Sequence, residues 1–416
     1  MTRREARVSL SENKNSVHID LSKLVEEARI SSRRELVSLI ENRQEGLIER
    51  LCGPMYSRDH PYRRGGGYTK RLVTALGMIT FKVKRVINRE TGKVSSPILE
   101  ALDIKHRKYS RGVRMACAEY ASKMSYGDAS LEYKTGTGIQ VPKRTIHTWV
   151  QEIAPTLLEA YKAEADTNKD TVFPLVMGDS TKVRGLGSGE MNNVRVITTG
   201  KGSTQLQVLG VNTPWPRTHA KVLVSDDEEG LVNSVTAEER QLCILHAVKR
   251  LGFILWSDGM SLKERKKALK AIKKPLFTLV NSTEKHLLDG DMDRLKWRIG
   301  HTLKELRHRA EELRVKGYPK ACEYLEKHAP LLVTFAELAL EGIKVPYTNN
   351  LIERLMGEIS KRCKNKWMHW STKGLRNILT LILIRYTDRE AYHRFKNAYI
   401  HNQPITNVKS RILTNK

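Results

Sequence analysis

Several features that define large classes of proteins are scarce in this chain of 416 residues. Its longest apolar run, Ile378 to Ile384, is far shorter than the roughly 20 residues that cross a bilayer, and its first residues lack the apolar core of a secretion signal. The five cysteines are scattered without a Cys-x-x-Cys pair, which disfavours both a disulfide framework and a complete zinc knuckle. We therefore expect a cytoplasmic protein in a reducing compartment, with no membrane partner.

Acidic residues are also in short supply. Against 73 Lys and Arg the chain has 46 Asp and Glu, which gives a net charge of +27 at pH 7. Such an excess attracts polyanions, so nucleic acid is the first partner to consider. Aromatic residues make up 6% of the chain and hydrophobic residues 40%, which is typical of a folded protein with a polar surface. At roughly 150 residues per domain, the length predicts two or three domains.

The amino-terminal part divides into a helical segment and a strongly basic segment. Residues 1–15 are polar and lack periodicity, whereas apolar residues between Asp20 and Leu51 recur at helical spacing. We expect residues 1–55 to form an arm followed by one or two helices. The stretch from residue 56 to residue 150 holds 19 Lys and Arg against 7 Asp and Glu, so we expect residues 56–165 to be the DNA-binding region.

This basic region predicts a β-hairpin followed by a helix-turn-helix. RRGGGYTK predicts a glycine turn, and in ITFKVKRV apolar residues alternate with Lys82 and Lys84, as in a half-buried strand. Three short helical patterns follow, with a glycine-containing turn before the last. The third helix would present Lys143, Arg144 and His147 to base edges or phosphates. The alternative is a basic solvated face on an ordinary three-helix domain.

From Thr171 onward the pattern changes to short apolar strands separated by Gly and Pro, and then to helices from about Glu229. This order predicts a mixed α/β domain, interrupted by long, charged amphipathic helices. The predicted segments are an α/β domain of residues 166–260 and 343–400, a helical insertion of residues 261–342 and a carboxy-terminal tail of residues 401–416.

Three carboxylates stand where a metal site could form. Asp179 and Asp226 each follow an apolar run, and Glu353 lies near the start of a predicted helix. Acids at the ends of neighbouring strands can converge, and hard oxygen ligands without a thiolate select Mg²⁺ or Mn²⁺. Two such ions would hold the attacking and leaving oxygens of a phosphodiester displacement. Each acid also has a structural alternative: the aspartates could merely end strands, and Glu353 could be the reciprocal partner of a helix cap at Asn350.

Two other aspartates could be the second metal ligand in place of Asp226. Asp227 is adjacent to Asp226, and Asp258 follows the apolar run FILWS. We prefer Asp226 because an acid that directly ends a strand can face the carboxyl edge of the sheet, while its neighbour points to the opposite side.

Four segments resemble, in order, the catalytic blocks of Mutator-type transposases, including their bacterial and archaeal insertion-sequence relatives: VMGDSTKVR, VSDDEEGL, QLCILHAVKRL and TNNLIERLMGEISKR. The resemblance covers about half of the chain. It implies an RNase H-like mixed sheet with a helical insertion before the last acid. It also implies that Asp179, Asp226 and Glu353 are the catalytic DDE residues and hold two Mg²⁺ or Mn²⁺ ions.

The same resemblance assigns neighbouring residues and an activity. Cys243 and His246 match a Cys-x-x-His signature beside the site and Asn350 begins an Asn-x-x-Glu pattern, so all three are expected to shape the site rather than to bind zinc. The implied activity is cleavage and strand transfer of double-stranded DNA at the ends of a mobile element, by a homodimer or a larger assembly. The alternatives are a domesticated transposase that acts as a DNA-binding regulator, and an RNase H-like nuclease or resolvase.

A last basic segment, KRCKNKWMHWSTKGLR, follows the third acid. Its cations are interleaved with Trp367 and Trp370, which suits phosphate neutralisation and base stacking beside the metals. We expect Arg362 and Lys366 to contact DNA there. The two tryptophans could equally be core anchors of the final helices.

Overall fold

The computed structural model describes residues 20–54, 58–162, 172–199, 205–365 and 367–405. The predicted amino-terminal arm, Lys366 and most of the predicted carboxy-terminal tail lie outside these ranges. The chain forms two compact units, one of residues 1–113 with 134–139 and the other of residues 114–133 with 140–416.

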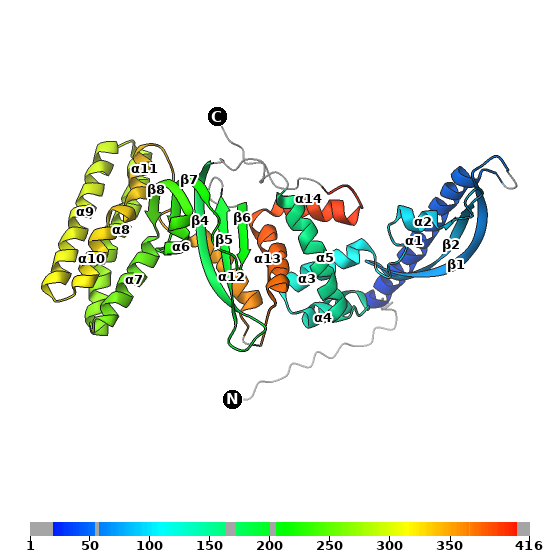
Figure 1. Cartoon of the computed structure of the whole chain (residues 1–416), viewed down its shortest axis with the longest axis horizontal. Coiled ribbons are helices and arrows are strands. Elements are labelled where there is room, and N and C mark those ends of the chain that lie inside the picture. The colour runs from blue at the N-terminus through cyan, green and yellow to red at the C-terminus, as the bar shows by residue number, and fades with distance from the viewer. Residues whose placement is uncertain (1–19, 55–57, 163–171, 200–204, 366, 406–416) are drawn as a thin grey trace, which may run out of the picture. The chain divides into compact units, whose positions relative to one another are not determined.

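The first unit combines one long helix with a small sheet (Figure 1). Ile40 of the helix and Phe81 and Val83 of the second strand share a buried cluster, which confirms both the predicted helix and the predicted alternating strand. Residues 20–51 form a single helix rather than two. The elements of this unit are α1 (Leu21–Cys52), β1 (Tyr62–Thr74), β2 (Gly77–Asn88), β3 (Val94–Ser95) and α2 (Pro97–Ala101), with the strands antiparallel in the order β1-β2-β3.

The predicted glycine turn is wrong. RRGGGYTK lies inside β1, where the pairing with β2 shifts between Arg64 and Gly67, and the chain instead reverses between Thr74 and Gly77. A Cβ atom on Gly67 would lie 2.9 Å from the carbonyl oxygen of Val83, so glycine permits the close approach of the two strands at this bulge. Glycine-rich composition fits a turn and a bulge equally well, and only the strand pairing distinguishes them.

Strand β3 pairs only with Val86 and Ile87 of β2, and side chains of α1 cover part of the edge of β2 that β3 leaves unpaired. Gln44 accepts a hydrogen bond from the amide of Lys84 at 2.8 Å and donates one to the carbonyl of Lys82 at 3.0 Å, while Glu41 accepts from the amide of Lys82 at 3.2 Å. These bonds satisfy backbone groups that an open strand edge would expose to other chains.

The second unit begins with three helices, α3 (Arg111–Lys123), α4 (Tyr126–Thr137) and α5 (Lys143–Lys162). The first three residues of α3 and the last four of α4 belong to the first unit. Helix α5 buries Trp149, and its Gln151 accepts a hydrogen bond at 2.6 Å from Asn377, which lies on α13 (Thr372–Thr387). Helix α5 therefore packs with the carboxy-terminal helices, and the compact units do not follow the predicted boundaries of region 56–165.

A five-stranded mixed sheet forms the centre of the second unit (Figure 1). Its first three strands are antiparallel to one another, and the last two run parallel to the central strand β4, which confirms the predicted mixed α/β class. The sequence interpretation missed β8, because Glu238, Glu239 and Arg240 interrupt its apolar pattern. The strands are β4 (Val172–Arg184), β5 (Met191–Thr199), β6 (Gln205–Val211), β7 (Thr218–Ser225) and β8 (Val235–Leu242), in the order β6-β5-β4-β7-β8.

Helices follow the sheet, as predicted, and those between β8 and α12 share one buried apolar cluster. Leu276, Leu295 and Leu306 are fully buried in it. The helices are α7 (Ile244–Ser257), α8 (Leu262–Asp289), α9 (Met292–Val315), α10 (Pro319–His328), α11 (Thr334–Leu340), α12 (Asn350–Cys363) and α14 (Arg389–Ile400), with short α6 (Glu229–Ser234) between β7 and β8 and the 3-10 helix η2 (Pro330–Leu332) before α11.

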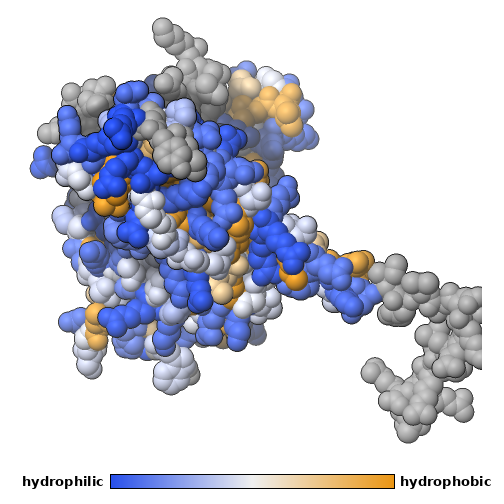
Figure 2. All heavy atoms as spheres, turned by 90° about the vertical axis from the view of Figure 1, so that its right-hand side faces the viewer, coloured by the Kyte–Doolittle hydropathy of each residue, from blue (hydrophilic) through white to orange (hydrophobic). Residues whose placement is uncertain are grey.

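In the described part of the chain, no helix combines the length and the apolar character needed to span a bilayer. The face of the molecule drawn in Figure 2 is predominantly hydrophilic, with hydrophobic side chains in small separate groups. All five cysteines are buried and have free thiols, in agreement with the predicted lack of a disulfide framework.

Candidate metal centre

Asp179 and Asp226 come from neighbouring parallel strands. Strands β4 and β7 pair in register as far as Met177 and Val224, and each aspartate lies two residues beyond this pair. Because side chains two residues apart along a strand share a face, Asp179 points to the side of Met177, and Asp226 follows directly after the end of β7. The expectation that Asp179 ends its strand is wrong, since β4 continues to Arg184 while paired with β5.

A glycine allows this part of the sheet to be covered closely. Gly178 precedes Asp179 on the opposite face of β4, and a Cβ atom there would lie 2.7 Å from the methyl groups of Leu231 on α6. Leu231 is fully buried in the apolar cluster on that face. The short helix α6 can therefore lie against the strand beside the acidic residue.

Burial makes both aspartates hard to ionise. Burial, followed by the charge of Asp226, raises the pKa of Asp179 from 3.8 to about 7, although the Ser180 amide donates a hydrogen bond to its carboxylate at 2.7 Å. Burial also raises the pKa of Asp226, while the positive charge of His246 acts in the opposite direction. Two neighbouring carboxyls of this kind are stabilised in their charged form by a cation.

Asp227 and Asp258, the two rivals of Asp226, have other partners. Asp227 accepts a hydrogen bond from Arg240 at 2.9 Å and lies 3.1 Å from Nε2 of the buried His328. Asp258 ends α7, because FILWS is helical and not a strand, and its carboxylate lies 3.4 Å from the Lys320 ammonium. Each of the two alternatives to Asp226 therefore has a basic side chain as its partner.

Sequence reasoning missed Glu228 as a further acid of this region. Its carboxylate accepts hydrogen bonds from the Ser180 hydroxyl at 2.8 Å and from the Trp215 indole at 3.0 Å. Its negative charge raises the pKa of both Asp179 and Asp226. The only signal for it in the sequence was its place two residues after Asp226.

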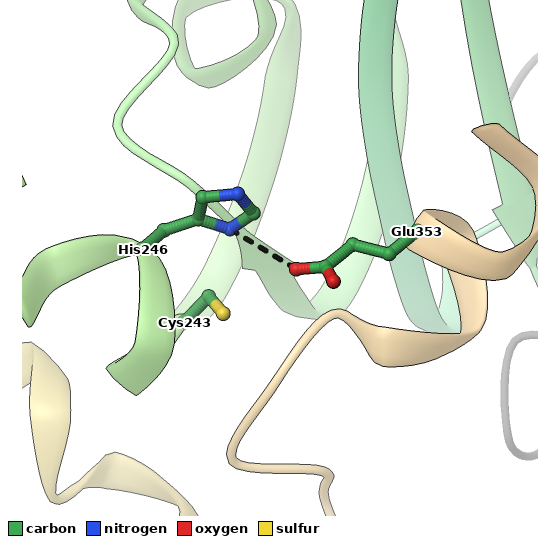
Figure 3. Close-up of side chains that lie close together, drawn as sticks. All are labelled: Cys243, His246 and Glu353. Carbon is green, nitrogen blue, oxygen red and sulfur yellow. Dashed lines mark ion pairs between the residues drawn. The ribbon is translucent and has the colours of Figure 1, made fainter. Parts of the chain in front are cut away.

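Glu353 reaches the same region from α12, which packs against β4. Figure 3 shows the imidazole of His246, on the first turn of α7, turned toward the Glu353 carboxylate, with Cys243 beside the start of that helix. The distance from His246 Nδ1 to Glu353 Oε1 is 3.5 Å. A hydrogen bond with Cys243, together with the charges of Asp226 and Glu353, raises the pKa of His246 to about 9 against the opposing effect of burial.

The structure thus brings the three predicted carboxylates to one region, with His246 next to both Asp226 and Glu353. In the described ranges, the ligand atoms of Cys243, His246 and Glu353 all lie within 4.8 Å of one another, and that set does not include the aspartates. Asp179 and Asp226 fit a hard divalent cation by their oxygen donors and their repulsion.

The proposed helix cap at Asn350 is wrong. Helix α12 begins at Asn350, and the capping residue is Asn349, which makes no side-chain capping bond. Asn350 is exposed, whereas Asn349 is fully buried. With Asn349 as the capping residue, Glu353 is four residues beyond it rather than the three that a capping box requires.

A cavity of about 570 Å³ opens beside Asp226 and His246. Lys249, Arg250 and Phe253 of α7 line one side of it, together with Tyr324 of α10. Carboxylates, cations and aromatic rings therefore line one cavity.

The predicted DNA-binding side chains lie in different environments in the structure. Lys143, Arg144 and His147 are exposed on α5, on the side opposite its buried residues, as the helical pattern predicted. Lys366 lies outside the described residues. Gln151, on the same helix, is used in packing against α13.

The expectation that Arg362 contacts DNA is wrong, because its side chain is buried, with 4% exposed. Its Nε donates a hydrogen bond to the Ala121 carbonyl at 2.8 Å, and its guanidinium lies 5.0 Å from the ring centre of Trp370 and 5.6 Å from that of Tyr126. Burial lowers the pKa of Arg362. Trp370 is buried as a core anchor and donates to the Cys363 carbonyl, whereas Trp367 is 79% exposed.

Comparison with known proteins identifies one family. Residues 33–209 match the Uncharacterised protein family (UPF0236), a segment that includes Asp179 but ends before Asp226 and Glu353. No curated protein gives a significant match.

Proposed function

We propose that the chain is a Mutator-type DDE transposase that binds double-stranded DNA at the ends of its mobile element and catalyses cleavage and strand transfer. The observation that carries this proposal is the meeting of Asp179 and Asp226 beyond one register pair of parallel strands, with Glu353 reaching the same region beside His246.

The sheet supports an RNase H-like catalytic domain. Three successive antiparallel strands followed by two strands parallel to the first give the order β6-β5-β4-β7-β8, with the first strand in the centre. Helices α7 to α11 lie between Asp226 and Glu353 in sequence, which agrees with the helical insertion that the family resemblance implies.

Asp179 and Asp226, with Glu353, would hold two Mg²⁺ or Mn²⁺ ions. When bound, these ions activate an attacking oxygen and stabilise a leaving oxygen at phosphorus. The Ser180 amide orients Asp179, whereas Asp227 is paired with Arg240 and His328 and is not needed as a metal ligand. His246 supplies positive charge beside Asp226 and Glu353.

The exposed cations of α5 are the proposed contacts to the element ends. Lys143, Arg144 and His147 share an exposed face whose opposite side is buried. Each cation that neutralises a phosphate steepens the dependence of affinity on salt by about one unit of slope. Two element ends have to be held together during transfer, so we propose a homodimer or a larger assembly as the active form.

The test compares two adjacent aspartates. We expect Asp226→Asn to lower Mg²⁺-dependent cleavage of a duplex carrying the DNA that flanks the coding sequence by about 10³-fold or more, with DNA affinity unchanged, because the metal ligands are lost. Asp227→Asn is the matched control and should retain cleavage, with its thermal unfolding measured to account for its lost ion pairs.

Equal cleavage by wild type and Asp226→Asn would refute the catalytic assignment. Binding of the flanking DNA without cleavage by the wild type in Mg²⁺ or Mn²⁺ would favour the regulator instead. Cleavage without joining would favour the nuclease.

A further inference from the structure

Cys243, His246 and Glu353 form a set of potential ligands that differs in chemistry from the two aspartates. The three ligand atoms lie within 4.8 Å of one another, and the residues come from two elements that converge, the start of α7 and the first turn of α12 (Figure 3). Cys243 is fully buried, while the side chains of His246 and Glu353 are 27% and 40% exposed. The set therefore has one closed side and one side open to ions.

The spacing of the set suits a tetrahedral ion. Metal–ligand distances of about 2.0–2.3 Å require neighbouring ligand atoms about 3.3–3.8 Å apart. His246 Nδ1 and Glu353 Oε1 are 3.5 Å apart, which lies within this range. Small side-chain rotations would bring the Cys243 sulfur to the same separation.

The donor types select a particular class of ion. Thiolate, imidazole and carboxylate together suit Zn²⁺ and Co²⁺, whereas Mg²⁺ prefers oxygen ligands alone. A spacing of Cys-x-x-His provides only half of a zinc site, which is why the sequence alone disfavoured zinc. The missing ligand, Glu353, is supplied from 107 residues further along the chain by folding.

We propose that Cys243, His246 and Glu353 bind one transition-metal ion of the Zn²⁺ class, with a fourth position open to water. Binding replaces the thiol proton of Cys243, and any second proton on the His246 imidazole, both of which pass to solvent. Because the ion occupies Glu353, it withdraws this carboxylate from the Mg²⁺ site and inhibits catalysis. Only this inhibitory consequence rests on the proposed function.

Co²⁺ is the probe for the site. Added to the metal-free full-length protein without Mg²⁺, it should produce the near-ultraviolet thiolate-to-cobalt band and the visible bands of a tetrahedral ion, and one equivalent of Zn²⁺ should abolish them. We expect Cys243→Ser to remove the near-ultraviolet band. Glu353→Gln, at a half-exposed position that disturbs folding little, should weaken Co²⁺ binding by at least about 10-fold.

Cys322→Ser is the matched control. Cys322 also lies in a set with two carboxylates, Glu311 and Glu326, but the Arg314 guanidinium is 3.1 Å from the first and 2.8 Å from the second. The cobalt spectrum should be the same in this variant as in the wild type. Absence of the band in the wild type, or its persistence in Cys243→Ser, would overturn the proposal.

The outcomes for metal binding and catalysis are separate. A cobalt band that depends on Cys243, in a protein that cleaves no DNA, would support the proposed metal site and refute the proposed function. Mg²⁺-dependent cleavage by a protein without the band would refute the metal site and support the proposed function. Where both are observed, Zn²⁺ should inhibit cleavage in the wild type and inhibit Cys243→Ser at least about 10-fold less.

Discussion

Two groups of carboxylates in the second unit differ in how neighbouring cations compensate their negative charge. We call Asp179, Asp226, His246 and Glu353 the site cluster, and Glu311, Cys322 and Glu326 with Arg314 the bundle cluster. In the bundle cluster, which joins α9 and α10, an arginine lies between the acids. In the site cluster, His246 lies 3.5 Å from Glu353 and its charge opposes the rise in the pKa of both aspartates, yet the pKa of both is raised.

The difference lies in burial as much as in pairing. The charged side chains of the bundle cluster are at the surface, where solvent screens their charges, and Arg314 is half exposed. Asp179 and Asp226 are partly buried and the pKa of both is raised, so a cation stabilises their charged forms more than it would at the surface.

The largest effect expected from this comparison is on catalysis. Glu353→Gln should lower Mg²⁺-dependent DNA cleavage by about 10²-fold or more, because the amide is a poor ligand for a hard cation. Glu326→Gln, the same change in the bundle cluster, should alter the rate less than twofold. Single-turnover cleavage rates measure both, and a similar loss in the two variants would show that the comparison is unfounded.

A smaller effect is expected on stability without metal. The pKa of Asp179 is raised from 3.8 to about 7, so the folded protein binds this proton more tightly than the unfolded chain, and stability is lost as the pH rises between these values. At pH 7.5 in EDTA, Asp179→Asn should therefore increase the free energy of unfolding by about 1–2 kcal/mol, after allowance for solvent screening.

Urea denaturation measures this gain, which should disappear at pH 4, where the wild-type carboxyl is already protonated in the folded state. Glu311→Gln, by contrast, removes a pairing partner of Arg314 and should give no gain at either pH. A loss of stability in Asp179→Asn at pH 7.5 would contradict the raised pKa.

The smallest effect concerns the bundle cluster alone. Arg314→Gln removes the cation that lies between Glu311 and Glu326, and should open this set, with Cys322, to a second and weaker equivalent of Co²⁺. Titration of the near-ultraviolet cobalt band in this variant and in the wild type measures the difference. If the variant binds no additional Co²⁺, the arginine is not what excludes metal from the bundle cluster.

Local patterns predicted much of the secondary structure. Helical periodicity identified α1 and the helices between residues 261 and 342, and alternation identified β2, because both periodicities depend only on neighbouring residues. The pattern failed where pairing overrides composition: β8 carries three consecutive charged residues, and the glycines of β1 lie in a bulge rather than in a turn. Strand partners distant in sequence decide both cases.

The candidate site shows the same division between sequence and structure. Neither burial nor direction can be read from a charged residue alone, so Arg362 resembled a DNA contact although it packs between Tyr126 and Trp370. The family resemblance placed Cys243 and His246 beside the site, but local patterns could not predict their contact with Glu353, because it joins two helices separated by the whole helical insertion.

The sequence by itself determined the positive charge of the chain, most of its helices, the alternating strand of the basic sheet and the three acids worth testing. The tertiary structure decided which acids meet, that Asp227 is paired with Arg240 and His328, and that His246 lies beside Asp226 and Glu353. The physical reason is that periodicity and composition act over a few residues, whereas burial and the electrostatic field at a carboxylate depend on every group that folding brings near it.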